Sequence, residues 1–315
     1  MEQFGIQFVV FAKLVMLALV SYVLAGQGTM LGGRTGVFNV AQEGIMLTGA
    51  SVGFLGAYLF GSLLAGMLLA MFAGGLFGLA LAYFTTSLKL DQFVIGLALF
   101  FIGLGLSTLF FKLVVGVTMQ PPLVPTLPDV AIPGLSRIPV LGQVLFSQNI
   151  MVYFAVLLSA FLYYLLYKTS FGLELRAVGE NPKAADSLGV NVARMRYLTT
   201  IVGGMLMGLA GAYLPMVYTG TFTEGIVRGR GWLAIALTFF GGWSPHLIFL
   251  GALFFAAVDV LSLRVQVAGG FGVPYQFLLM LPYIATMLVM MPAFRRVRAP
   301  AFLGQNYDRE KRTLA

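Results

Sequence analysis

Cysteine is absent from this sequence, histidine occurs once, and charged residues are scarce. Without cysteine the chain can form no disulfide, thiolate metal site or cysteine nucleophile. The single histidine, His246, excludes metal sites and proton relays built from several histidines. Lys, Arg, Asp and Glu make up 10% of the 315 residues, against about 25% in a soluble domain. Because so few charges cannot cover the surface of a soluble fold of this size, a soluble enzyme is excluded.

Hydrophobic residues are abundant instead, at 59% of the chain. A helix needs about 20 apolar residues to cross the hydrocarbon core. The runs that meet this requirement are 6–26, 62–87, 92–115, 148–168, 197–218 and 272–293. Two further runs, 35–60 and 232–264, are interrupted by polar residues or by Gly and Pro, and are predicted to be broken, re-entrant hairpins. The predicted fold class is an all-α polytopic membrane protein with about 8–10 transmembrane or re-entrant segments.

Lys and Arg lie at the ends of the apolar runs, which is the pattern of membrane orientation and not of a nucleic-acid surface, although the net charge is +8. The loop 169–196 and the tail 294–315 are rich in both residues and are predicted to be cytoplasmic. The loop 116–147 contains a cluster of prolines and few charges, and is predicted to be external. If both broken hairpins return to the outer side, the N- and C-termini both face the cytoplasm.

Two parts of the chain share one predicted order of elements, which indicates a duplicated unit. Residues 6–87 and 197–293 each contain a span, a broken hairpin and a span, in the same orientation. Discontinuous helices at matching positions of a repeat point to the substrate path of a transporter. Ordinary glycine-rich packing is the alternative, and Gly74-x-x-x-Gly78 and Gly204-x-x-x-Gly208 are motifs of close helix contact. The predicted organisation is two parallel-oriented repeats and a tail: 1–115, the external loop 116–147, 148–293 and 294–315.

The Gly-rich run up to Ala50 carries polar side chains within an apolar stretch. Asn39 and Glu43 are four residues apart and share a face if the run is helical, so they could line a polar path. A carboxylate in such a run is costly unless it is paired or faces water. The structural alternative is that Glu43 pairs with Arg34 or caps the N-terminus of a half-helix.

The cytoplasmic stretch 171–191 predicts a short, capped helix. Asn181 is a good N-cap, Pro182 suits the first helical position, and Gly189 ends the helix. Ala184 and Ala185 give the helix a small-residue face. Such a helix could enter a groove on a cytoplasmic partner; a solvated loop is the alternative.

Three stretches of the chain resemble one family of membrane proteins: Gly36–Ala50, Arg176–Asn191 with the Gly-rich span 203–211 after it, and Trp232–Gly242. They are similar to the permeases of bacterial and archaeal ABC importers, in the broad branched-chain amino acid, simple sugar and nucleoside permease family. The resemblance covers residues 30–293. The last stretch resembles the second-half hairpin of that family.

Within the family, Asn39 with Glu43-Gly44 and Met46 is most similar to the nucleoside branch. The resemblance implies a permease subunit that moves a nucleoside or related small solute across the cytoplasmic membrane of a bacterium or archaeon by alternating access. A permease for a simple sugar or a branched-chain amino acid is the alternative within the family. An ion-coupled secondary transporter, with a titratable carboxylate such as Glu43 or Asp259, is the alternative from another class.

The resemblance also implies partners. A second permease subunit, a paralogue, completes the path; two ATP-binding-cassette ATPase domains dock around 180–189; and an extracytoplasmic binding protein delivers the substrate. Lipid surrounds the chain and no nucleic acid is expected. The sequence lacks a Gly-x-x-x-x-Gly-Lys-[Ser/Thr] phosphate loop. We therefore expect a translocation subunit that is not an enzyme and holds no cofactor or metal, with ATP and Mg bound by the partner ATPase.

The residues predicted to carry these functions form two groups. The substrate path is predicted to be lined by Phe38, Asn39, Gln42, Glu43, Trp232, Thr238 and Trp243. The ATPase-coupling loop is predicted to use Glu180, Asn181, Pro182, Ala184, Ala185 and Gly189. Beside these groups, Asp259 is predicted to pair with Arg264, and His246 to cap a turn.

Overall fold

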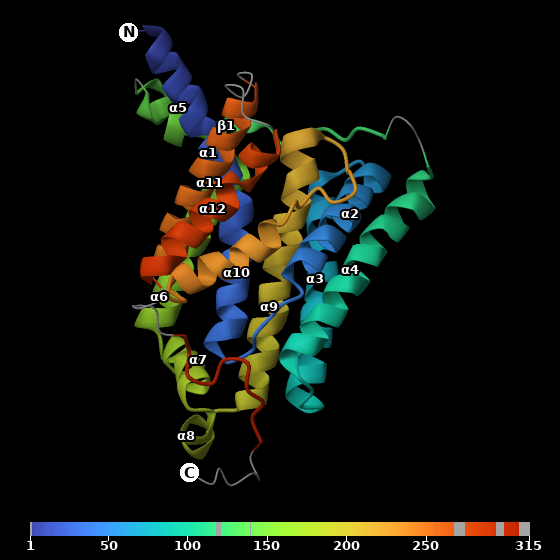
Figure 1. The fold of residues 1–315 in the computed structure, drawn as a ribbon, viewed down its shortest axis with the longest axis vertical. Helices are drawn as coiled ribbons and strands as arrows, with labels where there is room; N and C mark the ends of the chain where they lie inside the picture. Colours follow the sequence, from blue (N-terminus) through green and yellow to red (C-terminus); the bar gives the residue numbers. More distant parts are fainter. Residues whose placement is uncertain (1, 118–120, 139, 268–274, 294–298, 309–315) are drawn as a thin grey trace.

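A computed structural model describes residues 2–117, 121–138, 140–267, 275–293 and 299–308. Long helices form a bundle (Figure 1): α1 Glu2–Arg34, α2 Gln42–Phe60, α3 Leu63–Ala82, α4 Gln92–Val115, α6 Ile150–Lys168, α9 Val192–Tyr213, α11 Pro245–Val267 and α12 Tyr275–Ala293. Single π-helical turns, Tyr83–Ser87 and Leu214–Thr219, extend α3 and α9. The shorter elements are α5 Leu141–Leu145, α7 Ser170–Glu180, α8 Pro182–Ser187, α10 Arg230–Phe240, and the antiparallel pair β1 Asp129–Ala131 and β2 Ser147–Asn149.

Among the described residues, seven helices are long and apolar enough to cross a membrane. α10 and residues 276–288 of α12 are shorter apolar helices. The prediction of an all-α polytopic membrane protein is therefore confirmed, with a segment count within the predicted range.

α9 is the central helix of the bundle and packs against α1, α2 and α3. A Cβ atom added at Gly74 of α3 would overlap the carbonyl oxygen of Gly204, and one added at Gly28 of α1 would lie 2.6 Å from that of Gly203. The backbones of these helices are thus in direct contact. The small-residue motifs of α3 and α9 pack against each other, as such motifs do between membrane helices.

Residues 35–60 do not form the predicted broken hairpin. Residues 35–41 link two helices, and 42–60 form one continuous helix, α2. Gly44 lies within α2 without breaking it. Its lack of a side chain leaves room for the backbone of Phe100 on α4. The polar residues that suggested a break lie at the start of α2, where a helix has N–H groups without intrahelical partners.

The predicted break within 232–264 is confirmed. α10 ends at Phe240, the chain turns at Gly242 and Trp243, whose φ angles are 54° and 57°, and α11 begins at Pro245. α10 is an 11-residue helix, too short to cross the hydrocarbon core. α11 is long enough to cross it by length and composition.

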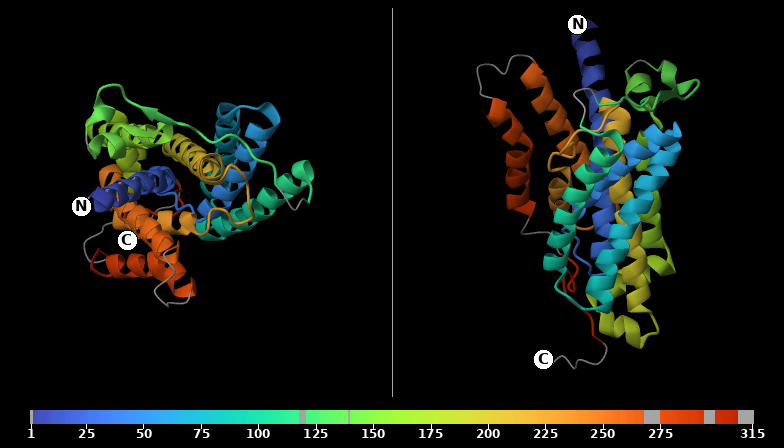
Figure 2. Two further views of the ribbon diagram at one scale, coloured as in Figure 1. Left: turned by 90° about the horizontal axis from the view of Figure 1, so that it is seen from above. Right: turned by 90° about the vertical axis from the view of Figure 1, so that its right-hand side faces the viewer.

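α1 and α9 run in opposite directions. Near its start, α1 contacts the 116–147 loop, where Lys13 Nζ lies 2.6 Å from Asp129 Oδ2. Just after its end, Thr35 Oγ1 lies 2.8 Å from Thr199 Oγ1 near the start of α9. The N-terminus accordingly lies at the opposite end of the molecule from the C-terminal segment (Figures 1 and 2).

The predicted same orientation of the units 6–87 and 197–293 is therefore wrong, and the described start of α1 and residues 299–308 lie at opposite ends of the bundle, not at one end as predicted for the termini. Both predictions rested on residues 35–60 forming a hairpin that returns to its starting side. Because α2 is a single helix that crosses once, the direction of α1 is reversed relative to that prediction (Figure 1).

Candidate functional site

α10 lies within the bundle, in contact with α1, α2, α11 and α12. Its first N–H groups and last carbonyl groups have no partners within the helix. In a membrane, unpaired backbone groups must be satisfied by other parts of the protein. The residues that satisfy them are therefore the main structural feature of this region.

The N-terminus of α10 is bound by the carboxylate of Glu43. Glu43 is 7% exposed; its Oε1 accepts a hydrogen bond from the backbone N–H of Gly229 at 2.8 Å, and its Oε2 accepts one from that of Gly231 at 2.7 Å. The negative charge also lies at the positive end of the helix dipole. A Cβ atom at Gly231 would lie 2.6 Å from the Cα of Glu43, so the site requires glycine there. Of the two structural alternatives for Glu43, capping of a half-helix is confirmed.

The turn that follows α10 is bound by Arg34, while the carbonyls of Leu237, Thr238 and Phe239 accept from backbone N–H groups of the same turn. Arg34 Nε donates to the carbonyl oxygen of Trp243 at 2.7 Å, and its Nη2 donates to that of Gly242 at 3.4 Å and to the Tyr167 hydroxyl at 3.3 Å. Arg34 therefore does not pair with Glu43. The two residues flank the link 35–41, so one stretch of chain supplies an anion for the start of α10 and a cation for the turn after it.

The structure gathers all seven predicted path residues around α10, but most of them face the interior. The buried members, each less than 9% exposed, are Asn39, Gln42, Glu43, Thr238 and Trp243. Asn39 Oδ1 accepts from Ala41 N at 2.8 Å, and Thr238 Oγ1 donates to the Ala234 carbonyl at 2.8 Å. These five side chains support the helix in this conformation.

Phe38 and Trp232 instead lie on the side of this region that faces away from the interior of the bundle. Trp232 is 39% exposed and packs edge-to-face on Phe100, with ring centroids 5.4 Å apart. Phe38 is half-buried and packs in the same way on Phe239, at 6.2 Å. Aromatic rings thus cover this side of α10.

The predicted ion pair between Asp259 and Arg264 is wrong. Five positions along a helix correspond to about 140° of rotation, so the two side chains leave α11 on different sides. Asp259 Oδ2 instead lies 2.9 Å from Arg230 Nη2, and Arg264 Nη1 donates to the Gln7 carbonyl at 3.1 Å.

The prediction that His246 caps a turn is also wrong. Its ring packs edge-to-face on Tyr163, with centroids 5.2 Å apart. Its side chain makes no hydrogen bond with the part of the chain that the structure describes.

The predicted short, capped helix within 171–191 is confirmed as α8. Asn181 Oδ1 accepts from Ala184 N at 3.0 Å, Pro182 is the first residue, and Gly189 follows the helix with φ of 88°. Ala184 is exposed, but Ala185 is 2% exposed and packs with Val178 and Val192. The predicted small-residue face is therefore only half available to a partner.

Sequence reasoning missed Leu188, which is 85% exposed at the end of α8. Together with Ala184 it gives α8 an exposed apolar surface. The signal was present in the sequence, because a leucine at the end of a polar helix has no place in the helix's own buried face.

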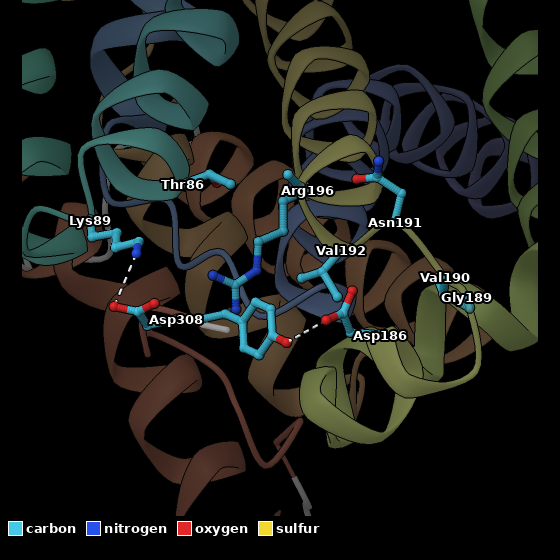
Figure 3. A pocket seen from close by; sticks show the side chains of 11 residues that line it. Thr86, Lys89, Asp186, Gly189, Val190, Asn191, Val192, Arg196 and Asp308 are labelled. Carbon is cyan, nitrogen blue, oxygen red and sulfur yellow. Dashed lines mark hydrogen bonds and ion pairs between the residues drawn. The ribbon is translucent and has the colours of Figure 1, made fainter. Parts of the chain in front are cut away.

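A C-terminal strap, residues 299–308, crosses the end of the bundle that carries α7 and α8. Phe302 N donates to the Gly179 carbonyl at 2.9 Å, and Gly304 N donates to the Gly36 carbonyl at 3.0 Å. Figure 3 shows a cavity of about 620 Å³ beside it, where Lys89 and Asp308 point toward one another, 3.0 Å apart. The strap thus joins α7 to the link 35–41 and to the α3–α4 connection.

Seven apolar helices around a short helix whose start is held by a buried carboxylate are the architecture of a polytopic membrane protein. The chain matches the family described as the permease component of the branched-chain amino acid transport system over residues 10–291, and it belongs to that family.

Curated relatives cover nearly the whole chain. The guanosine ABC transporter permease protein NupQ of Bacillus subtilis (strain 168) is 35% identical, over 92% of this chain and 93% of that protein. The nucleoside ABC transporter permease protein NupC of Lactococcus lactis subsp. cremoris (strain MG1363) is 35% identical, over 90% and 93%. The putative glucose ABC transporter permease protein TsgC13 of Haloferax volcanii is 32% identical, over 91% and 94%. The chain is a multi-pass permease subunit of an ABC importer.

Proposed function

We propose that this subunit imports a nucleoside across the cytoplasmic membrane of a bacterium or archaeon by alternating access. The observation that carries the proposal is the similarity, over nine-tenths of the chain, to permeases named for guanosine and for nucleosides, both at 35% identity. A simple sugar is the second candidate, because a glucose permease is 32% identical over a similar length.

The substrate path runs along the side of α10 that faces away from the interior of the bundle. Trp232, Ile235 and Phe239 are spaced by three or four residues, are only partly buried and form one stripe. Phe38 and Phe100 extend the stripe on either side. Flat aromatic faces suit a nucleobase, which stacks on such side chains. A second permease subunit, a paralogue, covers this face and completes the path.

ATP hydrolysis takes place on two partner ATPase domains, which bind ATP and Mg and dock on α8. Leu188 and Ala184 are the exposed apolar contacts of that docking surface. Movement of α8 reaches the membrane helices through the strap, since the strap is bonded to Gly179 at the end of α7 and to Gly36 in the link 35–41. That link leads directly to Glu43, which holds the start of α10.

An extracytoplasmic binding protein delivers the substrate to the end of the bundle that carries the loop 116–147. In this orientation the described start of α1 lies on the extracytoplasmic side, and α8 and the strap lie in the cytoplasm. The Lys and Arg residues of 169–196 support this assignment, because short cytoplasmic loops carry an excess of these residues.

The ion-coupled alternative requires a carboxylate free to exchange a proton or bind sodium. Glu43 accepts two backbone hydrogen bonds, and Asp259 pairs with Arg230. Both carboxylates thus have partners that fix α10, and this favours an ATP-driven mechanism.

The test is uptake by a strain lacking this gene, complemented with the wild type or with Leu188→Asp, using labelled guanosine, adenosine, ribose and leucine at submicromolar concentration. We expect the wild type alone to restore nucleoside uptake, with equal amounts of both proteins in the membrane. Restored uptake of ribose or leucine in place of nucleosides would overturn the proposal that the substrate is a nucleoside. Normal uptake by Leu188→Asp would overturn docking at this surface.

A further inference from the structure

A second cavity, lined by none of the aromatic residues of the stripe on α10, lies between α1, α10, α11 and α12. Its volume is about 490 Å³, within the roughly 300–1,000 Å³ of small-molecule sites. The side chains that give it polar character are Tyr22, Arg228, Arg230, Asp259, Gln266 and Tyr283. Such a collection of polar groups is unexpected between apolar helices.

The ion pair in this cavity lies at membrane depth. Asp259 is eight residues before the end of α11, which is about 12 Å along the helix. Its Oδ2 lies 2.9 Å from Arg230 Nη2 and 3.4 Å from the Tyr22 hydroxyl. Its Oδ1 accepts no hydrogen bond from the described residues. Ionisable groups at this depth are costly and mark ligand sites more often than packing.

A second guanidinium stands at the mouth of the cavity. Arg228 is exposed and has a φ of 51°, a conformation that costs energy for a residue other than glycine. Tyr283 Oη donates to its carbonyl oxygen at 3.1 Å, and Glu43 holds the next residue, Gly229, through its N–H. The Arg228 guanidinium itself makes no hydrogen bond or ion pair within the described ranges. The backbone is thus fixed while the charged end stays available.

We propose that this cavity binds the base of a purine nucleoside, an inference that rests on the proposed function. The guanidinium of Arg228 can donate two parallel hydrogen bonds to neighbouring acceptors, as arginine does to O6 and N7 of guanine. Asp259 Oδ1 can accept from a ring N–H or amino group of the same base. The ring of Tyr283, which is 45% exposed, offers a face for stacking. A free sugar has no planar edge on which a pair of acceptors and an N–H donor lie together.

The absence of cysteine in the chain allows a direct test without a transport assay. Gln266→Cys places the permease's only thiol in this cavity, and Arg264→Cys is the matched control. Both positions are partly buried on α11, but Arg264 faces a different cavity. The rate of labelling by N-ethylmaleimide is measured on the full-length chain in membrane vesicles, with guanosine, adenosine, ribose or glucose added.

We expect guanosine to slow labelling of Gln266→Cys about tenfold when its concentration is about ten times its Kd, and to leave labelling of Arg264→Cys unchanged. In the double variant Gln266→Cys, Arg228→Lys, the guanosine concentration needed for the same protection should be about tenfold higher. Unchanged labelling of Gln266→Cys at every nucleoside concentration would overturn the proposal, as would equal protection by ribose or glucose.

The two failures are distinguishable. If the strain complemented with the wild type takes up nucleosides but no nucleoside protects Gln266→Cys, this cavity is not the subsite and the proposed function stands. If no nucleoside is taken up and none protects, the proposed function fails as well.

Discussion

The two short helices α10 and α8 are held by different kinds of partner. The start of α10 is bound by Glu43 and the turn after it by Arg34, which are 186 and 209 residues away in the sequence from Gly229 and Trp243. In the first turn of α8, the N–H of Ala184 is bound by Asn181, the residue directly before the helix. One helix is completed by distant charged groups and the other by a neutral neighbour.

The difference follows from the surroundings of each helix. Near the cytoplasmic surface, water can satisfy whatever a cap leaves unpaired, so a neutral side chain is enough. Within the membrane no water is available, and hydrogen bonds to ionised groups are about twice as strong as neutral ones. The α10 region is therefore expected to be far more sensitive to loss of its partners than α8.

The largest effect is expected for Glu43→Ala, which leaves the N–H groups of Gly229 and Gly231 without acceptors. A hydrogen bond to a charged group contributes about 1.5–3 kcal/mol, so we expect a loss of about 3–6 kcal/mol in the free energy of unfolding. Denaturant titration of the detergent-solubilised protein measures it. Glu224→Ala is the matched control, because that carboxylate is 59% exposed and pairs with Lys112; equal losses would contradict the comparison.

A smaller loss is expected for Arg34→Leu, which removes the donors to the Trp243 and Gly242 carbonyls. We expect about 2–3 kcal/mol by the same titration, because water can reach the cytoplasmic ends of neighbouring helices more easily than the start of α10. Arg34→Lys keeps the charge but not the fork geometry, and should recover part of the loss. Stability unchanged in Arg34→Leu would show that the turn after α10 needs no cation.

The same comparison explains which features the sequence predicts. α8 was predictable, because its cap, first proline and terminal glycine are adjacent in the chain. The partners of α10 were not, because nothing in the sequence joins Glu43 to Gly229 and Gly231. Glu43 was recognised as an unusual buried carboxylate, with capping as one alternative.

The errors have the same origin. Polar residues at the start of α2 resembled a break within it, since local pattern cannot show that they serve the N-terminus of another helix. The Asp259–Arg264 pairing relied on nearness in sequence, whereas Arg230 comes from α10. Sequence alone therefore singled out the residues around α10 but not their contacts.

For α8, Asn181→Ala should cost about 1 kcal/mol, the usual contribution of an N-cap. The effect should be local: amide hydrogen exchange across Pro182–Ser187 speeds up, while the unfolding titration is unchanged. Asn181→Ser retains an acceptor at the cap and should restore slow exchange. A fall in global stability comparable to that of Glu43→Ala would contradict the distinction between the two helices.

The smallest effect is expected for Tyr307→Phe, which removes the hydrogen bond from the strap to Asp186 Oδ2 of α8, 3.0 Å long. Because Asp186 is partly exposed, water screens this bond and we expect it to contribute about 0.5–1.5 kcal/mol, so exchange of the α8 amides should accelerate about two- to tenfold. Tyr197→Phe is the control, because its hydroxyl bonds Ser87 at 2.6 Å at the same end of the molecule without touching α8. If the strap transmits movement of α8, Tyr307→Phe should also lower uptake per molecule of permease, although global stability is unchanged. Uptake equal to that of Tyr197→Phe would mean that this contact holds α8 in place without taking part in coupling.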